Sequence, residues 1–147
     1  MICTFFGHKD TPNKVEPVLR KILIDLIENK NVNEFYVGNN GRFDGMVKSV
    51  LRELRKIYTD IDFSVVLAYM PKEKDEHGIE DFSDTIFPEG LELVHPRYAI
   101  VKRNRWMVEQ SDYVVTYVEH RYGGAAQFKE LAERKSKKVI NIPELEI

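Results

Sequence analysis

The sequence predicts an α/β fold in which helices cover both faces of a mostly parallel sheet of about five to six strands, a three-layer αβα sandwich. Two observations support this fold class. Short apolar runs alternate along the chain with longer segments whose apolar residues recur at helical spacing. The short runs are also almost continuously hydrophobic, as strands that are covered on both faces must be. We expect residues 1–147 to form a single domain.

Each expected strand is an apolar run that ends at turn residues. These runs are Met1–Phe6, Glu34–Val37, Phe63–Met70, Thr85–Phe87, Asp112–Val118 and Lys138–Ile142. Each expected helix carries an apolar stripe or follows a residue that starts helices, such as Pro96. The helical segments are Val15–Ile27, Met46–Tyr58, Pro96–Gln110 and Gly123–Lys135, the last of which begins with a glycine turn.

The segment Lys72–Asp84 is charged and aperiodic, which is typical of a surface loop. Its length and its place after an expected strand leave open a second interpretation, a mobile lid over a ligand.

Composition excludes several classes of protein. The net charge of −2 argues against wholesale binding to nucleic acid or to a membrane surface. No apolar run approaches the roughly 20 residues that span a bilayer. The first ten residues lack the features of a signal peptide, and the single cysteine, Cys3, fits a reducing compartment. We therefore expect a cytoplasmic protein.

The loops that follow the strands are expected to meet at one edge of the sheet, because crossovers between parallel strands are right-handed. Two of these loops are rich in glycine. The stretch "YVGNNGRFDG", Tyr36–Gly45, precedes one helix, and Gly123–Gly124 precedes another. Glycine lets the backbone approach a phosphate, and a helix N-terminus favours an anion. A flexible turn with a helix cap explains either loop equally well, and Asp44 could cap its helix or hold a ligand hydroxyl.

Residues at this edge are the candidates for ligand contacts, through their side chains or their backbone. They are Gly7, His8, Asp10, Gly38, Asn39, Asn40, Gly41, Asp44, Arg97, Asn104, Gly123, Gly124, Ala125 and Gln127. His8 could instead be a turn residue, and His120 is an outside candidate. No residues stand at the spacing of a metal site, so we expect neither a metal nor a cofactor.

Arg103 has two interpretations. Asparagine is unfavourable within a helix, so Asn104 beside Arg103 suggests a polar task there. A solvent-exposed helix face explains a lone arginine equally well. Trp106, on the same helix, is expected in the core or at an interface between subunits.

The order of five segments resembles one family. The segments "FFGH", "YVGNNGRFD", "RNRWM", "SDYVVTYV" and "GGAAQF" are similar to the SLOG superfamily of Rossmann-like proteins, which includes DprA and the Lonely Guy enzymes. The resemblance spans Thr4–Ile142 and is strongest to small free-standing bacterial members, the YpsA-like proteins of unknown function. It implies a Rossmann-like fold and a nucleotide pocket at the glycine loops.

The resemblance also implies two catalytic positions. Arg103 matches the arginine with which Lonely Guy enzymes cleave the bond between base and ribose phosphate. Glu130 matches the second of two acidic positions after the glycines. The turn departs from the family pattern, because Tyr122 replaces a proline, and Ala126 and Gln127 stand where the family has glycine and threonine.

Three functions follow from these observations. The leading one is a sensor or carrier that binds a nucleoside phosphate or an ADP-ribose-like ligand. The alternative is a Lonely Guy-like hydrolase of the N-glycosidic bond of nucleoside monophosphates, and the minor one is a DprA-like nucleic-acid-binding module. We also expect a homodimer.

Overall fold

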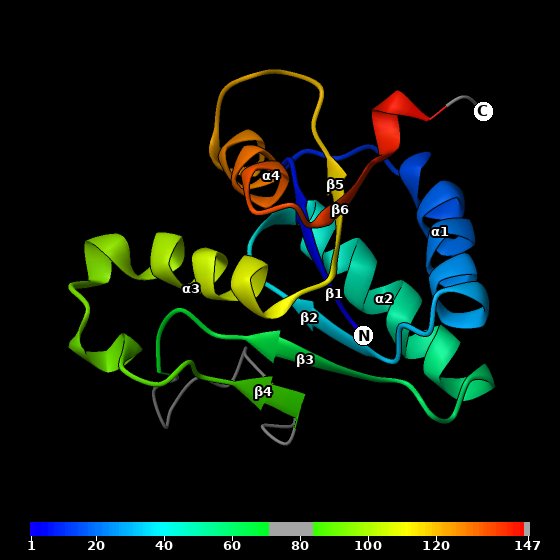
Figure 1. Cartoon of the computed structure of the whole chain (residues 1–147), viewed down its shortest axis with the longest axis horizontal. Helices are drawn as coiled ribbons and strands as arrows, with labels where there is room; N and C mark the ends of the chain where they lie inside the picture. The colour runs from blue at the N-terminus through cyan, green and yellow to red at the C-terminus, as the bar shows by residue number, and fades with distance from the viewer. Residues whose placement is uncertain (71–83, 146–147) are drawn as a thin grey trace.

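The computed structural model describes residues 1–70 and 84–145 and confirms the predicted fold class (Figure 1). All strands of its six-stranded sheet pair in parallel. The strands are β1 (Ile2–Gly7), β2 (Glu34–Val37), β3 (Asp62–Val66), β4 (Thr85–Ile86), β5 (Tyr113–Tyr117) and β6 (Lys138–Asn141). The helices are α1 (Val15–Asn29), α2 (Gly41–Ile57), α3 (Pro96–Gln110) and α4 (Gly124–Arg134), and two short 3₁₀ helices cover Leu91–Leu93 and Ile142–Glu144.

The strand order β4-β3-β2-β1-β5-β6 puts β1 in the middle of the sheet. The chain first builds outward through β2, β3 and β4, and then returns to place β5 on the other side of β1. The order therefore reverses between β1 and β5. In open parallel sheets such a reversal leaves a crevice at the carboxyl ends of the two strands, where ligands bind.

Each face of the sheet has its own apolar core. Figure 1 shows α1 and α2 on one side of the sheet and α3 and α4 on the other. On the first side the fully buried Phe5 and Phe35 stack with ring centroids 6.1 Å apart. On the second side Phe6 stacks on Phe128 of α4 at 5.3 Å. Successive residues of β1 thus point to opposite faces, which explains its continuous hydrophobic run.

Two predicted boundaries differ from the structure by four or more residues. Helix α2 begins at Gly41, five residues before the expected Met46, so much of the glycine-rich stretch is helical. The earlier start is stabilised by Asp44, whose carboxylate accepts a hydrogen bond from the backbone of Asn40, the N-cap residue. Strand β3 ends at Val66 rather than at Met70, because the chain bends away from the sheet and leaves Met70 exposed.

Trp106 is half-buried and stacks on Tyr36 of β2 with ring centroids 5.3 Å apart. The Trp106 ring therefore has a packing partner within its own chain. The expected loop Lys72–Asp84, with its possible lid, lies outside the described residues except for Asp84. Among the helices of the described ranges, none combines the length and the apolar character that crossing a membrane requires.

Candidate functional site

A cavity of about 370 Å³ opens at the carboxyl end of the sheet, beside the point where the strand order reverses. Its walls come from the end of β1, the β2–α2 turn, one face of α3 and the β5–α4 turn. The lining residues are Phe5, Phe6, Gly7, His8, Lys9, Asp10, Gly38, Asn40, Asp44, Ile100, Arg103, Asn104, Met107, His120, Gly123, Gly124 and Ala125. Its volume lies within the usual range for small-molecule sites, roughly 300–1,000 Å³.

The glycines of the β1 and β2 ends are required by the protein's own packing. A Cβ on Gly7 would stand 2.3 Å from Cγ of the buried Phe43, and one on Gly38 would stand 2.8 Å from Oδ2 of Asp44. Gly41 has a φ of +86°, and a Cβ there would stand 2.9 Å from Cα of Lys9. These three positions therefore favour glycine whether or not a ligand binds.

Asp44 is a buried carboxylate in the cavity wall, with only 8% of its surface exposed. Its Oδ2 accepts a hydrogen bond of 2.9 Å from the backbone N–H of Asn40. Burial raises the pKa of Asp44 to about 6, against the smaller opposing effects of the Asn40 N–H, Arg103 and Lys48. The N-terminus of α2 thus already holds an anion that belongs to the chain.

Arg103 comes from α3 and is buried, with 3% of its surface exposed. Nη1 donates to the carbonyl oxygen of Val66 at 3.1 Å, and Nε donates to Oδ1 of Asn104 at 2.9 Å. With its amide oriented to accept, Asn40 Oδ1 takes a bond of 3.2 Å from Nη2. Burial lowers the pKa of Arg103, and the negative charge of Asp44 counters this effect. Three acceptors therefore hold a buried cation in the cavity wall.

The β5–α4 turn is open. Gly123 is the N-cap residue of α4, with a φ of +93°, and forms no side-chain cap bond. A Cβ on Gly123 or Gly124 would meet no atom of the described residues within 4 Å. Among the described residues, the N–H groups of Gly124, Ala125 and Ala126 have no acceptor, and the first bond of this turn runs from Gln127 to Gly123. Helix N-termini with free N–H groups attract anions.

His8 and His120 form the wall between the β1 end and this turn. Their rings stack with centroids 4.1 Å apart, and Nε2 of His8 accepts a bond of 3.0 Å from the backbone N–H of Glu119. Burial and the neighbouring His120 lower the pKa of His8, which favours the neutral imidazole that can accept this bond.

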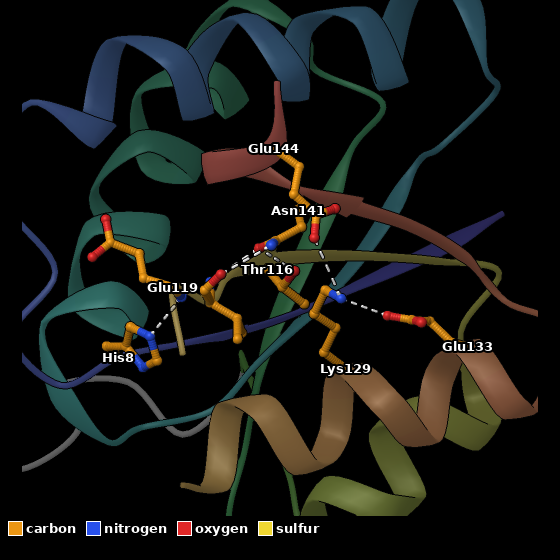
Figure 2. A network of polar contacts seen from close by, with 8 residues as sticks. His8, Thr116, Glu119, Lys129, Glu133, Asn141 and Glu144 are labelled. Carbon is orange, nitrogen blue, oxygen red and sulfur yellow. Dashed lines mark hydrogen bonds and ion pairs between the residues drawn. The ribbon is translucent and has the colours of Figure 1, made fainter. Parts of the chain in front are cut away.

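Asn141 anchors the end of β5 beside this wall, as Figure 2 shows. Its Oδ1 accepts bonds from Thr116 Oγ1 and from the backbone N–H of Val118, both at 2.9 Å, and its Nδ2 donates to the Val118 carbonyl. The buried amide therefore fixes the chain just before the β5–α4 turn.

The cavity brings together most of the residues that the sequence singled out, but not all of them. Those outside its lining are Asn39, Gly41, Arg97, Gln127 and Glu130. Asn39 accepts a bond from Lys48, and Arg97 is exposed with its guanidinium over the ring of Tyr98. Gln127 is also exposed.

Glu130 lines a different cavity, of about 380 Å³, together with Glu119, Lys129 and Glu133. Figure 2 shows part of this polar group, in which Lys129 pairs with Glu133 at 2.6 Å and with Glu144 at 3.7 Å. Arg103 does not line this second cavity. The two residues proposed as a catalytic pair therefore line different cavities, which share His120 in their walls.

Sequence reasoning missed Lys9 and the apolar part of the lining, which is Phe5, Phe6, Ile100 and Met107. The apolar residues carry the same signal as core residues, so no pattern could separate them. Lys9 lies between His8 and Asp10, directly after β1, so it lines the cavity together with these two neighbours.

No protein-family model and no curated protein matches this chain. Within residues 1–70 and 84–145, no group of three or more His, Cys, Asp or Glu side chains could hold a metal ion. The site is thus defined by its geometry: a buried cation and a buried carboxylate beside an uncapped helix N-terminus.

Proposed function

We propose that the protein binds a nucleoside phosphate or an ADP-ribose-like ligand in the cavity between β1 and β5. The observation that carries the proposal is the uncapped N-terminus of α4, where the N–H groups of Gly124 and Ala125 line the cavity and lack an acceptor within the described part of the chain, and the glycines leave open space there. A phosphate there would accept these N–H bonds and interact favourably with the helix dipole.

The remainder of the cavity suits the other parts of a nucleotide. Its lining combines apolar side chains, Phe5, Phe6 and Met107, with the polar groups of Asp44 and Arg103. Ligand sites typically combine a largely apolar wall with a few polar groups that fix orientation. The position at a reversal of strand order also supports a ligand site.

Binding without hydrolysis is the version that we propose. A hydrolase of the Lonely Guy type would need Arg103 and an acidic group such as Glu130 at one ligand, whereas these residues line different cavities. Acid–base groups contribute typically about 10² to 10⁴ in rate. We therefore expect release of adenine from AMP to be slow or absent.

Membership of the SLOG superfamily, a cytoplasmic location and a homodimer belong to the same proposal and rest on the sequence resemblance and composition. Sedimentation at micromolar concentration tests the dimer. The net charge of −2 argues against nucleic acid as a partner.

Thermal unfolding in the presence of AMP, NAD, ADP-ribose and cyclic nucleotides tests the function. A ligand that binds only the folded state raises the unfolding temperature in a concentration-dependent way. We expect at least one of these ligands to do so in the wild type and to lose the effect in Arg103→Ala. A panel without any shift at millimolar concentration contradicts the proposal.

A chromatographic assay on the same samples tests the absence of chemistry. Rapid release of adenine that disappears in both Arg103→Ala and Glu130→Ala would show the binding-only version to be wrong.

A further inference from the structure

We propose that Asp44 and Arg103 together bind the ribose hydroxyls of the ligand, so that the cavity selects ribonucleotides over deoxyribonucleotides. This inference rests on the proposed function and names the part of the nucleotide that the inner wall of the cavity recognises. It gives Asp44 two simultaneous tasks, one for each of its oxygens.

The first task of Asp44 is structural. Oδ2 accepts the N–H of Asn40, the residue that caps α2, and this bond fixes the orientation of the carboxylate. The second oxygen, Oδ1, has no hydrogen-bond donor within the described part of the chain. Oδ1 is not among the side-chain atoms that are both fully buried and without a hydrogen-bond partner, so some of its surface is accessible. Because Asp44 lines the cavity and is 92% buried overall, its accessible edge faces the cavity. Within residues 1–70 and 84–145, that oxygen is a fixed acceptor without a donor.

Arg103 supplies donors near the same carboxylate, on the side of its bonded oxygen Oδ2. Its bonds to Val66, Asn104 and Asn40 use three of its five N–H groups, which leaves two for a ligand. A Cβ placed on Gly38 would lie 2.8 Å from Asp44 Oδ2 and 3.5 Å from Arg103 Nη2, so both side chains converge over this glycine. Among the described residues, however, neither group takes part in a direct ion pair.

A hydroxyl fits between these two groups better than the alternatives. Its hydrogen can be donated to Asp44 Oδ1 while its oxygen accepts from the Arg103 guanidinium. An amino group of the base can donate to the carboxylate but offers the arginine no acceptor. A second phosphate would bind the arginine but repel the carboxylate. A ribose carries two adjacent hydroxyls, so it can satisfy both side chains at once.

The burial of Asp44 strengthens this selectivity. A bridging hydroxyl would bond to two buried groups of opposite charge at once, and hydrogen bonds to charged groups are stronger than neutral ones. Removing the hydroxyl that donates to Asp44 would leave Oδ1 of this buried carboxylate without a donor, which is the situation in which binding sites discriminate most strongly.

Isothermal calorimetry with AMP, 2′-deoxy-AMP, 3′-deoxy-AMP and inosine monophosphate tests the inference. We expect the wild type to bind AMP about 10- to 100-fold more tightly than at least one deoxy analogue, the range for one bond to a charged group. Asp44→Asn keeps an oxygen that can cap Asn40 but lacks the charge. In this variant the preference should fall to within about threefold. Asp62→Asn removes a carboxylate at the start of β3, at the opposite edge of the sheet, and should leave the preference unchanged.

A second arm varies the pH. The ratio of the AMP and deoxy-AMP affinities cancels the titration of the phosphate, which both ligands share. Protonation of Asp44 replaces a charged acceptor by a neutral group, so this ratio should fall as the pH is lowered from 8 to 5 in the wild type and stay constant in Asp44→Asn. A purely structural role of Asp44 predicts no such pH dependence.

The outcomes separate the two proposals. If AMP binds but the deoxy analogues bind equally well, or if Asp44→Asn keeps the preference, the inference is wrong and the proposed function stands. If only inosine monophosphate binds poorly, the carboxylate contacts the base and the inference is also wrong. If no nucleotide binds the wild type, both are overturned.

Discussion

The two glycine-rich turns look alike in sequence but differ in what their glycines touch. In the turn before α2, Gly38 and Gly41 are pressed against Asp44 and Lys9, and the neighbouring Gly7 is pressed against Phe43. In the turn before α4, a Cβ on Gly123 or Gly124 would meet none of the described residues within 4 Å. Other residues of the protein fill the space beside the glycines of the first turn, whereas none of the described residues fills the space beside the glycines of the second turn.

The polar groups of the two turns differ in the same way. At the start of α2, Asn40 N–H is bonded to Asp44 and Arg42 N–H to the Lys9 carbonyl at 3.0 Å. At the start of α4, the first three N–H groups have no acceptor in the described ranges. A glycine-rich turn at a helix N-terminus is therefore weak evidence for a phosphate site until its internal acceptors are known. Here the comparison favours α4.

The largest effect expected from this comparison is on stability. Gly7→Ala places a methyl group inside the van der Waals radius of the Phe43 ring, which is fully buried and cannot move freely. We expect the free energy of unfolding in urea to fall by about 1–3 kcal/mol, the usual range for overpacking. A variant as stable as the wild type would mean that the first turn is not closely packed.

The second effect is on binding. Gly124→Val puts a branched side chain where we place the phosphate, in a turn that has room for it. We expect the Kd for AMP to rise by at least about tenfold while the free energy of unfolding changes by less than about 1 kcal/mol. Unchanged affinity in calorimetry would show that the phosphate does not bind at this turn.

The third effect depends on pH. The pKa of Asp44 is raised from 3.8 to about 6 in the folded protein. Between these values the folded state holds more protons than the unfolded state, so this group destabilises the fold progressively as the pH rises and fully above pH 6. Asp44→Asn removes that penalty and keeps a side-chain oxygen that can accept the Asn40 N–H. We expect the variant to be about 1–2 kcal/mol more stable than the wild type at pH 8.

The same difference should approach zero near pH 4, where Asp44 is protonated in the folded protein. Urea unfolding of both proteins across this range measures it. A stability difference between the two proteins that does not vary with pH would show that burial does not raise the pKa of Asp44.

The smallest effect serves as a control on the turn before α2. Gly45 lies inside α2, outside the cavity lining, and a Cβ there would meet nothing within 4 Å. Gly45→Ala should raise the free energy of unfolding by about 0.5–1 kcal/mol through helix propensity alone. The affinity of this variant for AMP should equal that of the wild type. A loss of affinity would show that the turn before α2 also contributes to binding, against the distinction drawn between the two turns.

The sequence predicted the parallel sheet because its strands are continuous apolar runs, and it predicted the bounds of α3 because Pro96 marks the first helical position. It could not place the start of α2, since the Asn40–Asp44 bond depends on the side-chain geometry of the folded turn. It also left Arg103 between surface and pocket. A buried arginine and an exposed one have the same helical spacing, and only the contacts with Val66 and Asn104 separate them.

A crystal structure of the protein with AMP tests the central claim most directly. We predict that the phosphate oxygens lie within hydrogen-bond distance, about 2.7–3.2 Å, of the backbone nitrogens of Gly124 and Ala125. The phosphate should have no bond to Asn40 or Arg42, whose N–H groups already have acceptors. A phosphate seated on the α2 turn, or a nucleotide bound outside the cavity, would contradict the account.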